Sequence, residues 1–453
     1  MNIYNPFETQ SREFEARVLF CLEAASKGHN SYLGHKTSFD KFYKNLFPGI
    51  FLHKSIQKRK LIQFNHLSNM GHINCAFDEE GLMIFDEEEY FGYRAVKECL
   101  NKIDFLFTWG DKDREMIIKK YPEFSKKVHS AGNSRIDILK DNNKYNFLVK
   151  KIKKEYGNFI LINTKFCRFN VKDRGMGSFA DMCKYNTPNL QKRIYKKIIN
   201  SVEFERKSMN KYFATITKLS NDFHNLKFII RPHPAENHDV WKNFAKTIKN
   251  NNVEIIFDGG SANPWMLAAK KVISYNCTTS IEAILLNINS INFLPIKSKT
   301  FEYELPQICA KTIRSYKDLK HNLLNNFQIE NDSNRIKYYI QNSEKQTFCK
   351  NFLEIIENKI DKNKFSRQNI SYSFFRLNIS KIIVFFVKYY SLYFGNYKNR
   401  RGLYWQKFPG FSIKNIQNIS NTYPKFSNIS IKETFPGIFL FKQEKLYFSN
   451  KVR

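Results

Sequence analysis

The sequence lacks the cysteine and histidine spacings that mark a disulfide framework or a structural zinc site. Its eight cysteines are scattered, with no Cys-x-x-Cys pair and no Cys/His grouping at zinc-ligand spacing. This pattern predicts a reduced, cytoplasmic protein. We expect it to need neither a metal nor a cofactor.

Features of an exported or membrane-spanning chain are also missing. Residues 1–6 lack the basic and then apolar layout of a signal peptide. The longest strongly apolar stretch, residues 379–394, is interrupted by Lys381 and Lys388 and is too short and too charged to cross a bilayer. We therefore expect no signal peptide and no transmembrane helix.

Acidic residues are scarce. The chain of 453 residues has 42 Asp and Glu against 74 Lys and Arg, a formal charge of +32. A polyanionic partner, an anionic membrane surface or a compositional bias toward Lys and Asn would each explain this charge, and composition alone does not separate them. The length and the hydrophobic content of 42% suit two domains of ordinary size plus an extension.

The chain alternates short β-like runs with amphipathic helical segments. In the first part, strands are predicted at 2–6, 31–34, 50–53, 73–77, 105–109 and 128–131, and a Lys- and Asn-rich stretch at 140–154 predicts a linker. In the second part, strands are predicted at 159–163, 228–231, 254–257, 272–275 and 290–294, with helices near 188–220 and 315–358. Such alternation is typical of parallel sheets. We predict an α/β protein with two doubly wound, Rossmann-like domains, residues 1–145 and 155–360, facing each other across a cleft.

The last part of the chain, residues 361–453, has a different composition. It holds 17 Lys or Arg against three Asp or Glu, and aromatic residues are interleaved with the charges, as in the run 385–390. Basic and aromatic residues on a short amphipathic segment suit a helix lying in the membrane interface. A solvated basic subdomain packed on the core explains the same composition.

The first candidate binding motif is Arg231-Pro232-His233-Pro234, directly after an apolar run. Polar side chains that follow a strand of an open α/β sheet lie at its carboxyl edge, where ligands bind. The two prolines stiffen the loop, and a preorganised guanidinium beside a histidine suits a phosphate or carboxylate. The competing interpretation is a proline-stopped strand with two surface side chains.

The second motif runs from Asn276 through Thr278, Thr279 and Ser280 to Glu282. Hydroxyls and free amides at the start of a helix suit a phosphate, and an acidic residue one turn later suits ribose hydroxyls. The same residues also satisfy an ordinary helix cap with a capping-box Glu. Lys165, at the end of the strand 159–163, is a further donor-side candidate.

Acidic residues form the third motif, Asp78-Glu79-Glu80-Gly81, after the strand 73–77. Carboxylates opposite a cationic pocket are placed to deprotonate an acceptor hydroxyl or to act as a nucleophile. A solvated acidic loop is the alternative. Near the N-terminus, Glu8, Arg12 and Glu13 close the first strand and open the first helix, and either line the acceptor side of the cleft or cap the helix.

Several of these motifs, together with Thr108-Trp109-Gly110 and Gly132-Asn133-Ser134-Arg135, resemble the bacterial surface carbohydrate biosynthesis protein family over residues 1–345. More distantly, the second part is similar to GT-B enzymes such as capsule Kdo transferases and CDP-glycerol glycerophosphotransferases. The resemblance implies a GT-B fold, no obligatory metal, and a nucleotide-activated donor bound by the residues of the first and second motifs. The Asp-Tyr-Ser-Ser type run of the polyol-phosphate enzymes is replaced here by the segment 274–280.

These observations favour a metal-independent glycosyltransferase of surface polysaccharide biosynthesis. It would move a sugar, such as a Kdo-like acid, from a nucleotide donor to a glycan or lipid-linked glycan acceptor. Transfer of a polyol phosphate from a CDP donor is the nearest alternative. A noncatalytic nucleic-acid or glycan-assembly binding protein is a third class, although the sequence contains no known nucleic-acid motif.

Overall fold

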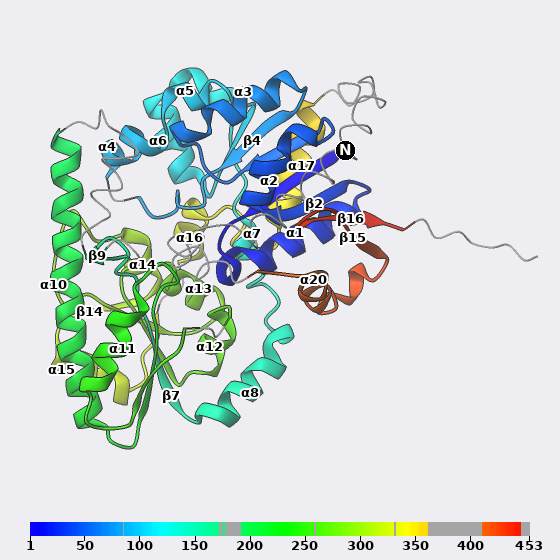
Figure 1. The fold of residues 1–453 in the computed structure, drawn as a ribbon. Helices are drawn as coiled ribbons and strands as arrows, with labels where there is room; N and C mark the ends of the chain where they lie inside the picture. The colour runs from blue at the N-terminus through cyan, green and yellow to red at the C-terminus, as the bar shows by residue number, and fades with distance from the viewer. Residues whose placement is uncertain are drawn as a thin grey trace, which may run out of the picture.

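The computed structural model describes residues 1–84, 86–171, 175–176, 192–257, 260–329, 332–360 and 410–444. Two lobes, each built on a β-sheet, face each other (Figure 1). The first sheet has the strand order β15-β16-β2-β1-β3-β4-β5-β6 and the second has the order β11-β10-β7-β12-β13-β14. The predicted α/β fold with two doubly wound sheets is confirmed.

Strands β1 to β6 of the first sheet are parallel to one another, and all strands of the second sheet are parallel. The bounds of the first set are β1 (Asn2–Phe7), β2 (Asn30–His35), β3 (Ile50–His53), β4 (Ile73–Phe77), β5 (Phe105–Thr108) and β6 (Val128–Ser130). Those of the second set are β7 (Phe159–Asn163), β10 (Lys227–Arg231), β11 (Val253–Ile255), β12 (Lys271–Ser274), β13 (Ser290–Phe293) and β14 (Lys311–Ile313). A short hairpin, β8 (Asn170–Val171) with β9 (Gly175–Met176), stands apart.

The strand orders place a topological switch point in each sheet. In the first sheet the order reverses between β1 and β3, and in the second between β7 and β12. Ligands of doubly wound proteins bind in the crevice outside the carboxyl ends of the strands at such points. The loops that follow these four strands are therefore the parts of the chain to examine for a site.

Helices cover both faces of each sheet because successive strand residues, which point to opposite faces, are apolar. In β7, Phe159 and Leu161 enter one hydrophobic cluster while Ile160 and Ile162 enter another, as expected for a parallel strand buried on both sides. The first lobe carries α1 (Glu15–Ser26), α2 (Lys36–Phe42), α3 (Leu61–Asn69), α4 (Glu87–Glu89), α5 (Lys97–Leu100), α6 (Asp111–Lys120) and α7 (Ser134–Asp137). Next along the chain are α10 (Lys192–Asp222), α11 (His238–Thr247), α12 (Asn263–Ala268), α13 (Thr279–Leu285), α14 (Glu304–Cys309), α15 (Tyr316–Leu324) and α16 (Ser333–Tyr339).

After the second sheet the chain returns to the first lobe. Helix α17 (Phe348–Lys359) packs on α1, where the rings of Phe348 and Phe352 lie 5.7 and 5.6 Å from that of Phe20. Later, α20 (Ile413–Ser420) also contacts α1, and the hairpin of β15 (Ile429–Phe435) and β16 (Ile438–Gln443) extends the first sheet. Because β16 pairs antiparallel with β2, the hairpin is an integral part of the first sheet, with Ile438–Phe441 buried.

Part of the predicted linker is helical. Residues 140–154 were expected to be a linker, but α8 (Asn146–Tyr156) begins inside this stretch. Its residues Val149, Ile152 and Tyr156 recur at helical spacing and pack on the fold beside α12, so the amphipathic pattern outweighs the polar composition.

Within the described part of the chain, no helix has the length and apolar character that a bilayer crossing requires. Most of the basic, aromatic segment for which either an interfacial or a solvated position was predicted, residues 361–409 and 445–453, lies outside the described residues.

Candidate active site in the cleft between the two sheets

A cavity of about 1340 Å³ lies between the two lobes, at the carboxyl ends of both sheets. Both switch points open into it. Residues that follow β1 and β3 line one wall, and residues that follow β7, β10 and β12 line the other. Of the site residues predicted from the sequence, the cavity is lined by Glu8, Arg12, Glu13, Glu79, Glu80, Lys165, Arg231, His233, Thr278, Thr279 and Glu282.

The predicted Arg231 and His233 project from the turn after β10. The Arg231 guanidinium donates to the carbonyls of Gly260 and Ser261 at 2.7 and 3.2 Å and lies 5.2 Å from the Trp265 ring. Its burial lowers the pKa of Arg231 to about 10, so a bound anion would stabilise the charge on this side chain. The imidazole Nδ1 of His233 lies 3.0 Å from the Cys167 thiol.

A buried carboxylate, Glu236, holds this turn in place. It accepts hydrogen bonds from the His233 backbone N–H at 3.0 Å, the Thr164 hydroxyl at 2.8 Å and the Trp241 indole N–H at 2.9 Å. Burial raises the pKa of Glu236. The side chain thus ties the ends of β7 and β10 together and fixes where His233 points.

The loops after β7 and β12 form the rest of this wall. Lys165 lies 3.3 Å from the Tyr303 hydroxyl and 4.5 Å from its ring, while Thr278 and Thr279 border the cavity at the start of α13. Two predicted donor residues sit behind this surface instead. The side chain of Asn276 bonds to the backbone of Phe301 and Tyr303, and the Ser280 hydroxyl lies 2.7 Å from that of Ser274.

Asn276 adopts a positive φ of 44°, a conformation that asparagine tolerates better than most side chains. Together with its two side-chain hydrogen bonds, this conformation makes Asn276 a support for the loop that carries Thr278 and Thr279.

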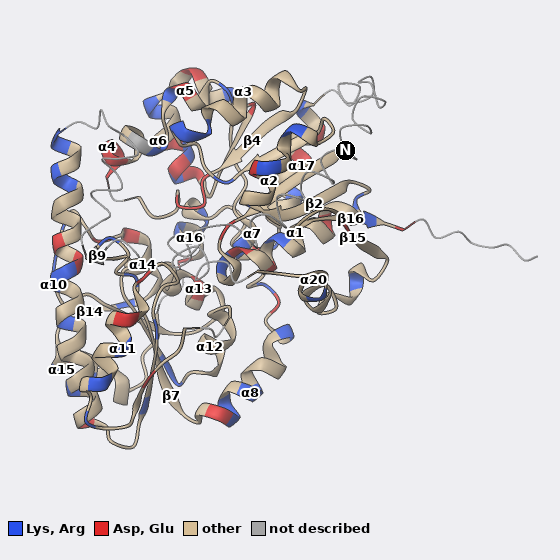
Figure 2. Cartoon of the chain, in the orientation of Figure 1, with Lys and Arg blue, Asp and Glu red and all other residues tan. Residues whose placement is uncertain are grey.

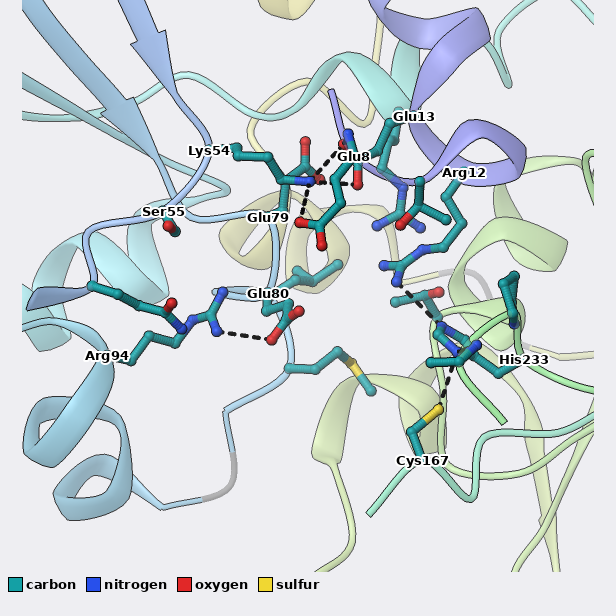
Figure 3. A pocket seen from close by; sticks show the side chains of 18 of the residues that line it. Glu8, Arg12, Glu13, Lys54, Ser55, Glu79, Glu80, Arg94, Cys167 and His233 are labelled. Carbon is teal, nitrogen blue, oxygen red and sulfur yellow. Dashed lines mark hydrogen bonds and ion pairs between the residues drawn. The ribbon is translucent and has the colours of Figure 1, made fainter. Parts of the chain in front are cut away.

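The opposite wall carries a compact group of charges after β1 and β3 (Figure 3). The ammonium of Lys54 lies 2.7 Å from both carboxylate oxygens of Glu13 and 3.3 Å from one of Glu8, whose other oxygen is 2.7 Å from Lys36. Burial opposes ionisation of Glu13, but Lys54 outweighs it and lowers the pKa of this carboxyl. This wall therefore holds an ionised carboxylate, Glu13, paired with Lys54. Carboxylate oxygens also accept hydrogen bonds from hydroxyl groups.

The three consecutive acidic residues after β4 have different surroundings. Asp78 does not line the cavity; both its oxygens accept from Arg94, at 2.6 and 2.5 Å. Glu79 is buried against Arg17 at the cavity edge. The Glu80 side chain is 67% exposed, accepts from Arg94 at 2.8 Å and reaches into the space between Arg94 and His233 (Figure 3). Glu80 is thus the accessible carboxylate of the three.

Two polar pairs bridge the cleft. The Arg12 guanidinium lies 3.2 Å from Nε2 of His233, and Arg135 donates to Glu282 at 2.7 Å. Burial works against the charge of Arg12, yet the surrounding carboxylates, Glu13 foremost, raise its pKa. The two lobes therefore both contribute groups to one charged site.

The Arg135 loop depends on Gly132, whose φ of +87° and contact with the Asn342 side chain leave no room for a Cβ. Among the described residues, no three His, Cys, Asp or Glu side chains are grouped as metal ligands would be.

Sequence reasoning missed the residues that hold this site together. Glu236 lies two residues after Pro234 of the Arg-Pro-His-Pro motif, so its closeness in sequence was a usable signal. Arg17 and Arg94 carried no comparable signal. They lie on α1 and after α4, and only the fold brings them against Glu79 and Asp78.

Comparison with known proteins adds to the description of the fold. No protein-family model matches the sequence, and no curated protein matches it. Among solved structures, a candidate UDP-N-acetylglucosamine 2-epimerase from Listeria monocytogenes is similar, with a TM-score of 0.50, 13% identity, and coverage of 80% of this chain and 98% of that one. A second example is S. aureus MnaA with UDP, with a TM-score of 0.49, 13% identity, and coverage of 81% of this chain and 98% of that one. A third is the Methanocaldococcus jannaschii UDP-GlcNAc 2-epimerase, with a TM-score of 0.49, 11% identity, and coverage of 79% of this chain and 100% of that one. At 13% identity the likeness to the Listeria monocytogenes structure concerns the fold alone, and it agrees with the GT-B-like arrangement of two facing α/β lobes.

Proposed function

We propose that this chain is a glycosyltransferase that moves a sugar from a nucleotide-activated donor to a glycan acceptor in the cleft. The observation that carries the proposal is the pairing of two unlike walls. One wall carries cations and hydroxyls, namely Arg231, His233, Lys165, Thr278 and Thr279. The facing wall carries the exposed carboxylate of Glu80 and the lysine-paired carboxylates of Glu8 and Glu13. Anionic donors and hydroxyl-bearing acceptors are recognised by these two kinds of surface.

The donor would lie against the second sheet with its phosphate beside Arg231 and His233. When the bond between the anomeric carbon and the phosphate oxygen breaks, negative charge collects on the leaving nucleotide. A fixed guanidinium in a water-poor site stabilises such charge without reorganisation. Lys165 and, from the other lobe, Arg12 would add to this field.

The acceptor would lie against the first sheet. Glu80 would take the proton from the attacking hydroxyl while that oxygen bonds to the anomeric carbon. Asp78 and Glu79, the other proposed catalytic carboxylates, are tied to Arg94 and Arg17 and would serve to place the loop.

The size of the cavity leaves room for a donor and an acceptor together. Sites for a single small ligand occupy roughly 300–1,000 Å³, and this cavity is about 1340 Å³. The similar Listeria monocytogenes structure is named as a candidate UDP-N-acetylglucosamine 2-epimerase, so epimerisation of a nucleotide sugar is the outcome to test against. Transfer of a polyol phosphate would use the same phosphate contacts.

The test is product analysis after incubation with CMP-, UDP- and GDP-linked sugars, with and without a membrane extract as acceptor source. Transfer predicts that acceptor raises the release of free nucleotide and that Glu80→Gln lowers this release by about 10²–10⁴-fold without weakening nucleotide binding. Glu354→Gln, exposed on α17, is the matched control. An epimeric nucleotide sugar without net nucleotide release would refute transfer.

A further inference from the structure

Helix α8 presents an unusual outer face. Its inner side is set by Tyr145, just before the helix, and by Val149, Ile152 and Tyr156, which recur at intervals of three or four residues and pack on the fold. Residues on the other side of the helix are free to face solvent. The helix lies at the periphery of the molecule in Figure 1.

The outward stripe consists of Phe147, Lys150, Lys151 and Lys154, spaced as i, i+3, i+4 and i+7. The side chain of Phe147 is 77% exposed, the most exposed large apolar residue of the described chain. The three lysines are exposed, as is Glu155 beside them, and no described acidic side chain lies within ion-pair distance of the three. Figure 2 shows blue and red segments on this helix. One exposed apolar ring is thus followed, over the next two turns of the helix, by three exposed ammonium groups.

Apolar surface continues next to this stripe. Leu148 is 44% exposed and borders a groove of about 560 Å³ between α8 and α12, lined also by Ile255, Ile256 and Pro264. Single exposed apolar residues are common, but a stretch of them bordered by lysines is typical of surfaces that meet a partner.

We infer that the outer face of α8 is a docking surface for an anionic lipid membrane. Lysines around an exposed aromatic ring match the interface of such a membrane, where the ammonium groups meet lipid phosphates and the ring enters the acyl boundary. The match is one of charge, because the stripe carries three cations, against the single exposed carboxylate of the helix, Glu155, at its flank. A convex helix surface also suits a flat bilayer better than a single strand of nucleic acid, which binds in grooves.

The position of α8 connects this surface to the cleft. Tyr145, at the start of the helix, accepts a hydrogen bond at 3.2 Å from Asn263, which lines the cavity. Helix α12 begins at Asn263 and packs on α8. A docked α8 would therefore hold the cleft near the bilayer, where a lipid-linked acceptor is presented. The docking surface itself does not depend on the proposed reaction, whereas this last step rests on it.

The test is co-flotation of the full chain with vesicles of phosphatidylcholine alone or with 30% phosphatidylglycerol, across a salt series. The wild type is expected to bind the anionic vesicles, less so as salt rises. Lys150→Gln/Lys151→Gln/Lys154→Gln should lower the partition coefficient at least tenfold. The matched control, Lys192→Gln/Lys196→Gln/Lys211→Gln, removes the same charge from α10 and should change it less than twofold.

Insertion of the ring is measured separately, with Phe147→Trp and brominated lipid as the quencher. Quenching of the fluorescence of the introduced indole, absent in an Ile199→Trp control on α10, supports the proposal. Equal loss of binding in both lysine variants, or binding without quenching, overturns it. Salt-sensitive binding of an oligonucleotide through the same lysines without quenching would assign the face to a polyanion instead. Nucleotide affinity is unaffected in each case, so a failure here differs from a failure of the proposed reaction.

Discussion

The role of Glu236 leads to a prediction that tests how the cationic turn is held. This carboxylate accepts from the His233 N–H and the Thr164 hydroxyl with one oxygen and from the Trp241 indole with the other. In Glu236→Gln, the new NH₂ group must face at least one of these donors. A buried donor left without an acceptor costs about 1–3 kcal/mol. Burial raises the pKa of the Glu236 carboxyl, so the substitution also removes an unfavourable buried charge, which offsets part of that cost.

We therefore expect Glu236→Gln to lower the free energy of unfolding by about 1–3 kcal/mol, measured by urea denaturation and far-UV circular dichroism. Trp241→Phe removes the indole donor that the amide would face. In the double variant the two losses should be less than additive, by at least about 1 kcal/mol, since neighbours in one network couple by that order. Additivity within about 0.5 kcal/mol would refute the network.

Other predictions concern stability. Burial raises the pKa of Glu205 from 4.5 to about 7, so the unfolded chain releases this proton at lower pH than the folded chain. The free energy of unfolding therefore falls as the pH rises from about 4.5 to 7. Glu205→Gln removes this dependence, so the free energy of unfolding of the variant, relative to that of the wild type, should rise by about 3 kcal/mol as the pH rises over that range, measured by urea titration. Parallel plots of the free energy of unfolding against pH for the two proteins would contradict the raised pKa of Glu205. Phe441→Ala, fully buried on β16, should cost about 3–5 kcal/mol, while exposed Lys442→Ala should cost under about 0.5; equal losses would mean that the hairpin is not core. Arg94→Ala removes the ion-pair partner of the buried Asp78 and should lower the free energy of unfolding by about 3–5 kcal/mol at pH 7, measured by thermal unfolding. A loss below about 1 kcal/mol would contradict a stabilising buried ion pair between these two residues.

Strand positions in the two sheets were predictable because each strand is a short apolar run ended by polar or turn residues. The strands at Ile50–His53, Ile73–Phe77 and Phe159–Asn163 lie where the sequence predicted them, and the other predicted strands differ by one or two residues at their ends. β14 (Lys311–Ile313) was missed because Ile313 is its single apolar residue, so no apolar run marks the strand.

The hairpin of β15 and β16 was missed for another reason. Its turn, Pro436-Gly437, and the apolar run Ile438–Phe441 are ordinary hairpin signals. They were outweighed by the basic composition of the surrounding segment. Its pairing with β2 joins residues about 400 positions apart, which local sequence patterns do not encode.

The candidate site was predictable to the extent that strand ends determine it. Arg231, His233 and Glu80 follow strands directly, and the sheet brings them to the cleft. What was not predictable is which polar groups face inward: Asn276 and Ser280 use their hydrogen bonds on the loop itself. That choice depends on side-chain packing between distant segments.

The most direct measurement is isothermal titration calorimetry of the full chain with CMP, CDP, UDP, GDP and ADP, for the wild type, Arg231→Ala and Arg206→Ala. Arg206 is exposed on α10 and pairs with Glu203, so its removal is a matched loss of charge away from the cleft. The proposed function predicts saturable binding of one nucleotide, weakened at least tenfold by Arg231→Ala and unchanged by Arg206→Ala. Absence of binding by all five nucleotides, or equal weakening in both variants, would contradict a nucleotide-donor site at Arg231.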